Sequence, residues 1–486
     1  MKASPEVVGI MPAGKLYVFN TLSGKEEVFV PLSGNEVRMF VCGQTVYDDS
    51  HLGHAKTYIN FDVVARWIRH LGYKLKYIQN ITDVDDKIVA RAAETGEEPI
   101  ELARRFESRF MEDMDSIGVR SSVDQYPRSH DYIENIRKQV QLLLDKDIAY
   151  VLDGDVYYDV ARFPTYTQLS GMKLEELGRH RIEPREGKRN TYDFALWKKA
   201  KPGEPLWDIA VRAGGKEIHL QGRPGWHIED TAITEAFFGP QYDIHGGARE
   251  LIFPHHTNEI AQAEAAFGIK PFVKYWLHSG VLNVNGVKMS KSLKNFVRIR
   301  DIIEKYGAEA LRLFILSTHY RKDVNYTESL MEDASRRLAR MYSSMSQIFN
   351  AENGTGSLTD ATVEGATGKF NSAMNDDFNT PLAISILHTF IEDARLVSES
   401  REGLSAEAKG QVFMAIASMS GILGILESEH YKEGLDKDAA ELISIREKLR
   451  KEKRFDEADR IRERLKEEYG IMVEDSIYGV IWKKLM

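Results

Sequence analysis

The N-terminal part of the chain shows a change of hydrophobic period that predicts a strand, a helix and a second strand. Residues 37–41 (VRMFV) form a short apolar run, and residues 54–71 carry apolar side chains at helical spacing until Gly72 stops the pattern. Residues 74–79 (KLKYIQ) then alternate as a strand does. A helix between two strands indicates a βαβ unit of a parallel sheet, in which ligands bind at the carboxyl ends of the strands.

The rest of the chain indicates more sheet, followed by a long helical part. Turn signals at residues 153–154 and 285–286 predict two hairpins. Residues 160–225 are rich in Gly, Pro and charge, which indicates an insertion with short strands. Helices are expected at 99–117, 129–147 and 255–267 and from about residue 300 onward, with a Gly-, Ser- and Thr-rich loop at 354–368.

Length and composition describe a globular chain of several domains. A chain of 486 residues exceeds one core, so we expect roughly two to four domains. The chain has no apolar run of about 18 residues, so no membrane span is expected. Its first residues do not resemble a signal peptide, and its single cysteine excludes an internal disulfide, so we expect a cytoplasmic protein. With a net charge of −9, any nucleic-acid binding needs a local basic surface.

Two short motifs suit the binding of a polyphosphate. HLGH (residues 51–54) falls at the start of the first predicted helix, where free N–H groups attract anions and two imidazoles, His51 and His54, can bond phosphate oxygens. Gly53 allows close approach of a ligand. KMSKS (residues 288–292) follows the second hairpin and offers two lysines as mobile charges. Taken alone, HLGH is more typical of a capping turn with solvent-facing histidines, and KMSKS is more typical of a basic surface loop.

A third cluster has the residue types of a metal site. Cys42 ends the first apolar strand, and His255 and Glu259 are four residues apart on a predicted helix, so both lie on one face. Thiolate, imidazole and carboxylate groups all bind zinc. The alternatives are a buried strand-end residue for Cys42 and an exposed helical pair for His255 and Glu259.

HLGH followed by KMSKS on an α/β frame resembles the class I aminoacyl-tRNA synthetases, which activate an amino acid with ATP and load it onto tRNA. Over nearly its full length the chain is similar to the cysteinyl-tRNA synthetase family. The matching stretches include MFVCGQTVYDDSHLGHAKTY, NITDVDDKI, RPGWHIED, DIHGG, FPHHTNEIAQAEA, YWLHSG and KMSKSLKNF. The cysteine before HLGH, with GWHIE and the FPHH stretch, is more specific than the two superfamily motifs.

The resemblance implies an α/β fold class and a division into domains. It places a Rossmann-like parallel-sheet catalytic domain at residues 1–145 and 222–320, interrupted by a connective insertion at 146–221. An α-helical bundle follows at 321–430 and a small C-terminal anticodon-binding domain at 431–486. The resemblance also suggests a monomer.

The resemblance assigns roles to the site residues. Zinc would be held by Cys42, His255 and Glu259 and would read the thiol of the substrate, so that serine is rejected. The catalytic residues would be His51, His54, Lys288 and Lys291. ATP, accompanied by Mg²⁺, would also contact Gly53, Glu250 and Ser290. The amino-acid pocket would be lined by Cys42, Thr82, Trp226 and His245, with plain core for Trp226 and a helix cap for Thr82 as alternatives.

One residue departs from the family pattern at the expected metal site. Asp230 stands where the family has a second cysteine. Zinc accepts a carboxylate oxygen at normal bond length, so we expect Asp230 to complete the ligand set. The resulting site would be harder, with weaker metal retention or a broader choice of metal. The alternatives are a water in place of Asp230 and a metal-poor site.

The implied reaction is attack of the L-cysteine carboxylate on the α-phosphorus of ATP, followed by transfer of the cysteinyl group to tRNA(Cys). Residues 446–468 hold slightly more Lys and Arg than Asp and Glu, which fits a tRNA surface or a salt-bridged solvated helix. Tyr478 and Trp482 are candidates for stacking anticodon bases. The rivals are a ligase joining cysteine to an amino sugar, whose relatives lack this tail, a non-catalytic regulatory paralogue, suggested by Asp230, and another class I synthetase such as a methionine enzyme.

Overall fold

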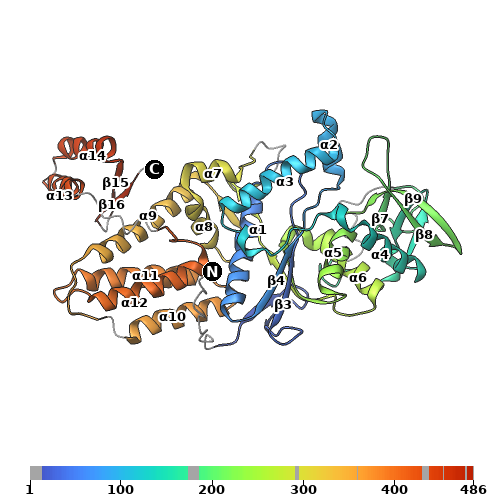
Figure 1. The fold of residues 1–486 in the computed structure, drawn as a ribbon, viewed down its shortest axis with the longest axis horizontal. Helices are drawn as coiled ribbons and strands as arrows, with labels where there is room; N and C mark the ends of the chain where they lie inside the picture. The colour runs from blue at the N-terminus through green and yellow to red at the C-terminus, as the bar shows by residue number, and fades with distance from the viewer. Residues whose placement is uncertain are drawn as a thin grey trace, which may run out of the picture. The chain divides into compact units, whose positions relative to one another are not determined.

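A computed structural model describes residues 14–172, 185–289, 295–357, 360–428, 437–452, 454–476 and 479–484 (Figure 1). The chain divides into two compact units, which are treated separately. The first comprises Met1–Lys305, Thr318–Tyr326 and Met374–Asn379. The second comprises Tyr306–Ser317, Thr327–Ala373 and Thr380–Met486.

A four-stranded parallel sheet forms the centre of the first unit (Figure 1). Its strand order is β11-β10-β3-β4, and each neighbouring pair is parallel. The strands are β3 (Glu36–Val41), β4 (Lys74–Gln79), β10 (Tyr242–Ala248) and β11 (Val273–Ser279). The helix α1 (Leu52–His70) connects β3 to β4, which confirms the predicted βαβ unit. Because parallel strands end at the same edge of a sheet, Cys42, Asn80 and Gly280 meet at one edge.

The other elements of the first unit surround this sheet and form the insertion. The predicted short strands of the insertion are confirmed as an antiparallel sheet in the order β5-β6-β7-β9-β8. These strands are β5 (Ala149–Leu152), β6 (Asp155–Tyr158), β7 (Phe194–Lys199), β8 (Trp207–Ala213) and β9 (Lys216–Pro224). The remaining elements are β1 (Tyr17–Asn20), β2 (Lys25–Val28), α2 (Asp86–Thr95), α3 (Pro99–Ser116), α4 (Ile133–Asp145), α5 (Ile228–Phe238), α6 (Thr257–Phe267) and α7 (Ile299–Tyr306).

The hairpin that precedes the KMSKS stretch is present as predicted. Asn285 and Gly286 both have positive φ, as a tight two-residue turn requires. They join β12 (Leu282–Val284) to β13 (Val287–Lys288), and β12 also pairs in parallel with β14 (Val324–Tyr326).

The second unit is mainly helical, as the pattern after residue 300 predicts. Its elements are α8 (Ala308–Leu316), α9 (Glu328–Asn350), α10 (Asp360–Asn375), α11 (Thr380–Ser398), α12 (Ala406–Leu423), α13 (Lys437–Lys451), α14 (Phe455–Tyr469), β15 (Ile471–Ser476) and β16 (Gly479–Lys484). The loop predicted at 354–368 is wrong in part, because α10 begins at Asp360. Phe370 and Met374 are buried one turn apart, and their packing outweighs the low helix propensity of the glycines.

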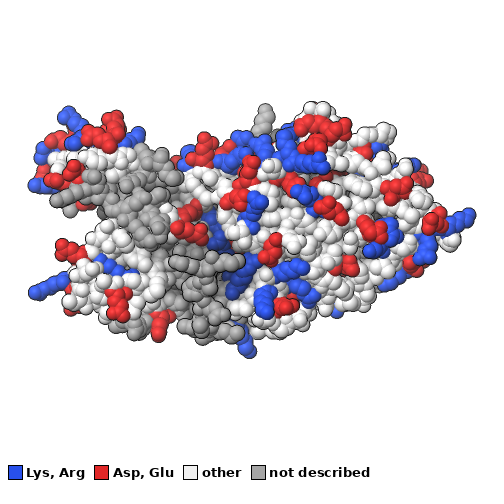
Figure 2. All heavy atoms as spheres, in the orientation of Figure 1, with Lys and Arg blue, Asp and Glu red and all other residues white. Residues whose placement is uncertain are grey.

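Charge on the surface is mixed. Figure 2 shows Lys and Arg interspersed with Asp and Glu on the visible face. On α14, Arg462 pairs with Asp459 and Arg464 with Glu468, as in a salt-bridged solvated helix. Tyr478 lies outside the described residues, and the side chain of Trp482 is likewise not described. Within the described ranges, we find no helix with the length and apolarity that crossing a membrane requires.

Candidate active site

A cavity of about 300 Å³ opens at the carboxyl edge of the parallel sheet. Most of the residues that the sequence singled out line it, namely Cys42, His51, Gly53, His54, Thr82, Trp226, Asp230, Glu250, His255 and Lys288. His245 and Glu259 are fully buried and contact the lining residues. Ser290 and Lys291 lie outside the described residues. Chain segments far apart in sequence therefore converge on one cavity.

HLGH forms the N-terminus of α1 through a reciprocal cap. The backbone N–H of His51 donates to Nδ1 of His54, and the N–H of His54 donates to Nδ1 of His51, both at 3.3 Å. The two rings stack with centroids 3.7 Å apart. A Cβ on Gly53 would lie 2.9 Å from the ring of His51, so glycine here makes room for that ring. Residues of HLGH therefore cap the helix and line the cavity at the same time.

The cap also determines the tautomer of both imidazoles. Because Nδ1 of each ring accepts a backbone N–H, the ring proton of the neutral form resides on Nε2. Burial, with a smaller effect from His51, holds the pKa of His54 well below its usual value. His54 is therefore a neutral Nε2–H donor at the edge of the cavity.

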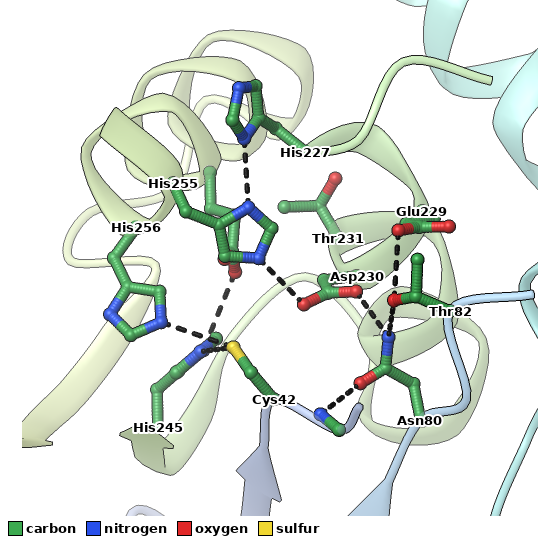
Figure 3. Close-up of polar contacts among 12 residues, drawn as sticks. Cys42, Asn80, Thr82, His227, Glu229, Asp230, Thr231, His245, His255 and His256 are labelled. Carbon is green, nitrogen blue, oxygen red and sulfur yellow. Dashed lines mark hydrogen bonds and ion pairs between the residues drawn. The ribbon is translucent and has the colours of Figure 1, made fainter. Parts of the chain in front are cut away.

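Cys42 and Glu259 belong to two overlapping groups that have the composition of a metal site. In the first group, Nε2 of His255 lies 3.1 Å from Oδ2 of Asp230 (Figure 3). The same nitrogen lies 3.1 Å from Oε1 of Glu259. In the second, Sγ of Cys42 lies 3.1 Å from Nε2 of His256 and 3.3 Å from Nε2 of His245. In each group, the ligand atoms lie within 4.8 Å of one another.

The electrostatics of this cluster fit a bound cation. Glu229, Asp230 and Glu259 are three carboxylates with almost no solvent exposure. Neither oxygen of Glu259 receives a hydrogen bond from the part of the chain that the structure describes. Burial, followed by the charges of Asp230 and Glu229, raises the pKa of Glu259, and burial with Asp230 and Glu259 raises the pKa of the Cys42 thiol. A divalent metal with sulfur, nitrogen and oxygen ligands would compensate these groups.

Asn80 positions Asp230, and the sequence did not reveal this role. Its Nδ2 donates to Oδ1 of Asp230 at 2.7 Å, and its Oδ1 accepts from the backbone N–H of Gly43 at 2.7 Å. Thr82 is buried beside it and donates to Oε1 of Glu229 at 3.2 Å, so the helix-cap alternative for Thr82 is wrong: Asp85 caps α2. Figure 3 shows Asp230 between His255 and Asn80.

Trp226 and His245 both contact the metal-site candidates. Trp226 is half-buried and stacks on His255 with ring centroids 4.3 Å apart, so it is not plain core. His245 is fully buried, with Nδ1 2.6 Å from the hydroxyl of Tyr242. The second ring nitrogen of His256 is similarly held, by His278 at 2.8 Å. These outer partners orient the rings toward Cys42.

Glu250 and Lys288, both expected to contact ATP, form an ion pair with each other. Their side chains are 45% and 69% exposed, so separating them costs about 1 kcal/mol or less. Either group is therefore available to a ligand that enters the cavity.

Several residues of the site were missed by the sequence analysis. Asn80, His227, Glu229 and His256 all lie within stretches that resemble the family, next to residues that were singled out. The motifs drew attention to neighbouring residues in the same stretches. Which side chains make contact depends on how distant segments of the chain pack, so the sequence alone did not single out these four.

Comparisons with known proteins point to one family for this chain. Residues 28–336 match the family model "tRNA synthetases class I (C) catalytic domain", and residues 369–427 match the DALR domain. A cysteine–tRNA ligase of Thermococcus onnurineus is 44% identical over 96% of this chain and 99% of its own length. A cysteine–tRNA ligase of Pseudomonas aeruginosa strain LESB58 is also 44% identical, over 96% of this chain and 99% of its own length.

Solved structures with a similar fold include other aminoacyl-tRNA synthetases. A Mycobacterium tuberculosis methionyl-tRNA synthetase in complex with methionyl-adenylate superposes with a TM-score of 0.57 at 16% identity, covering 80% of this chain and 90% of its own. A putative arginyl-tRNA synthetase of Campylobacter jejuni gives a TM-score of 0.54 at 14% identity, covering 81% and 93%. At these identities the likeness shows the fold alone, whereas the full-length sequence matches show that the chain belongs to the cysteine–tRNA ligase family of class I synthetases.

Proposed function

We propose that this protein activates L-cysteine with ATP and transfers the cysteinyl group to tRNA(Cys). The cysteine carboxylate attacks the α-phosphorus of ATP, pyrophosphate leaves, and the terminal ribose hydroxyl of tRNA then displaces AMP. The observation that carries the proposal is that a thiol, an imidazole and a carboxylate of one possible metal site face the same cavity as the HLGH cap.

The proposed metal ligands are Cys42, Asp230, His255 and Glu259. Three of these line the cavity, whereas the described lining includes neither His245 nor His256 of the overlapping group. A ligand set that reads a substrate must face the space that the substrate enters. Zn²⁺ held here would bind the substrate thiol and disfavour the hydroxyl of serine.

The remaining residues bind and orient the substrates. His51 and His54 present Nε2–H donors at the helix N-terminus, where the phosphates of ATP gain from both the donors and the dipole. Lys288 exchanges its ion pair with Glu250 for one with a phosphate. Lys291 of the same motif is proposed to bind a phosphate as well. Glu250 is then free to accept from a ribose hydroxyl. Mg²⁺ is proposed to enter with ATP.

The amino-acid pocket is proposed to include Thr82, Trp226 and His245. Trp226 lines the cavity and stacks on His255, which supports a role in bounding the space for a small side chain beside the metal ligands. Thr82 and His245 are buried and connected to the cluster by hydrogen bonds, which supports a role in shaping the pocket.

Amino-acid-dependent exchange of pyrophosphate into ATP tests this proposal, with cysteine and serine compared and metal content measured on the same sample. We expect exchange with cysteine, little with serine, and about one zinc per chain. Charging of tRNA(Cys) in a second assay separates this function from ligation to an amino sugar. Absence of exchange, or equal exchange with serine, would favour the regulatory paralogue.

A further inference from the structure

The segment that supports the hairpin before KMSKS is anchored by one buried carboxylate, Asp377. This residue belongs to the first unit, although α10 and α11 on either side of it in sequence belong mainly to the second. It is 2% exposed, and its φ of +49° is unusual for a residue other than glycine. A buried residue in this conformation needs strong contacts to hold it.

Those contacts converge on residues 319–321. Oδ1 of Asp377 accepts from the hydroxyl of Tyr320 at 2.9 Å and from the backbone N–H of Phe19 at 2.8 Å. Its Oδ2 accepts from Nε of Arg321 at 2.6 Å. Nε2 of His319 lies 3.7 Å from the same oxygen. One carboxylate therefore fixes the phenol of Tyr320 and the guanidinium of Arg321, and with them the backbone between.

The same backbone holds the start of the hairpin. The carbonyl of Tyr320 accepts from the N–H of Gly280 at 2.8 Å and from Nζ of Lys56 at 2.9 Å. A Cβ on Gly280 would lie 2.3 Å from the carbonyl oxygen of Lys322, so the two backbones are in direct contact. Lys56 lies two residues after His54 and also donates to Ser279 at 3.0 Å. The carbonyl thus connects the HLGH helix to the end of β11.

Beyond Gly280, the hairpin remains attached to the residues that follow Arg321. The N–H of Val281 donates to Asp323 at 2.9 Å, and the N–H of Asn285 donates to the carbonyl of Tyr326 at 2.9 Å. In between, β12 pairs with β14. Lys288, at the end of this hairpin, is therefore placed by a continuous backbone support that begins at Asp377.

We propose that Asp377 is a positioning residue for ATP, which acts through Tyr320 and the β12–β14 pair on the hairpin that carries Lys288. The proposal rests on the proposed function, since it takes Lys288 as a phosphate-binding group. It assigns Asp377 no contact with cysteine, because the cysteine pocket is built from Cys42, Trp226 and their neighbours.

The test compares Asp377→Asn and Tyr320→Phe with a matched control, Asp62→Asn. Asp62 is equally buried, and its carboxylate is bonded to Arg66 and Ser122 rather than to the segment that supports the hairpin. We expect D377N to lower kcat/KM for ATP in pyrophosphate exchange by about 10- to 100-fold, with KM for cysteine unchanged within about twofold. Y320F, which removes one hydroxyl, should act in the same direction and more weakly, and D62N should change neither.

Amide hydrogen exchange provides a readout that does not require activity. We expect the amides of Gly280, Val281 and Asn285 to exchange faster in D377N and Y320F than in the wild type and in D62N. If the wild type lacks cysteine-dependent exchange of pyrophosphate, the proposed function fails, and the amide pattern still decides the positioning role. The inference would be overturned if kcat/KM fell equally for ATP and for cysteine. It would also be overturned if the exchange rates of the hairpin amides were unchanged in both variants.

Discussion

At the residue scale, Asp230 is the residue that the sequence analysis sets apart from the family pattern, and we propose it as a metal ligand. Asp230 contacts His255 on one side and Asn80 on the other. A carboxylate in place of a thiolate keeps a negative ligand but removes a soft sulfur, and zinc retention depends on both properties.

Substitution of Asp230 should therefore change metal retention in two directions. We expect Asp230→Cys to retain zinc longer than the wild type during dialysis against a chelator. Asp230→Asn, which lacks the charge, should lose it sooner, with affinity lower by at least about tenfold. Metal analysis after timed dialysis measures both. If all three proteins lose metal at the same rate, Asp230 is not a ligand.

Asn80 is expected to act on the metal through Asp230. Its replacement by alanine removes the donor to Asp230 and the acceptor of the Gly43 N–H. We expect Asn80→Ala to lower zinc affinity by about tenfold, as outer-shell partners typically do, and to leave KM for ATP unchanged. Competition with a chromogenic chelator gives the affinity. Asn190→Ala in the insertion is the control, since it removes a partner of Asp159 and, among the described residues, Asn190 has no hydrogen bond to a proposed metal ligand.

At the element scale, α1 is tied to the end of β11 by a buried lysine. Lys56 is 1% exposed, and burial lowers its pKa from 10.5 to about 7. The unfolded chain therefore binds more protons than the folded one between pH 7 and 10.5, and the contribution of Lys56 to stability rises with pH across that window.

Thermal or urea unfolding of the wild type and Lys56→Met at several pH values tests this. The difference in unfolding free energy between the wild type and K56M should shift in favour of the wild type by up to about 1.4 kcal/mol per pH unit above pH 7. Below pH 7 this difference should stay constant. A constant difference from pH 6 to pH 10 would mean that the pKa of Lys56 is not lowered.

Element prediction succeeded where a local period or a turn dictated the structure. The βαβ unit and the two hairpins follow from alternation and from turn residues with positive φ, whereas the short strands of the insertion were expected from its content of Gly, Pro and charged residues. It failed at residues 360–368, where glycines suggested a loop and tertiary packing of α10 prevailed. Residues 129–132 form a 3₁₀ turn before α4, although a single helix was predicted there.

At the scale of the whole molecule, a net charge of −9 opposes association with nucleic acid. Binding of tRNA must then depend on local Lys and Arg groups among the mixed charges of the surface (Figure 2). Raising the salt concentration from about 50 to 200 mM should increase KM for tRNA(Cys) by at least about tenfold, because phosphate contacts release counterions. KM for cysteine in pyrophosphate exchange serves as the internal control and should stay within about twofold. If KM for tRNA(Cys) did not change with salt concentration, recognition through phosphate contacts would be excluded.

The sequence by itself determined the residue types, the order of the motifs and the resemblance to a family. These are local properties, and Cys42, HLGH, GWHIED and FPHH carry them without any knowledge of packing. The comparisons confirm the family and the α/β fold with a helical C-terminal part. The domain boundaries, the monomeric state and the cytoplasmic location stay predictions.

Only the tertiary structure decided which side chains meet. It showed two overlapping four-residue groups around Cys42 and Glu259, the bridge from Asn80 to Asp230, and the anchor from Asp377 to the hairpin. The partners in these contacts are separated by up to 358 residues, as for Phe19 and Asp377, and no local period encodes such separations. Contact between distant segments arises from the register of the sheet and the packing of α5 and α6 on it, which only the folded chain specifies.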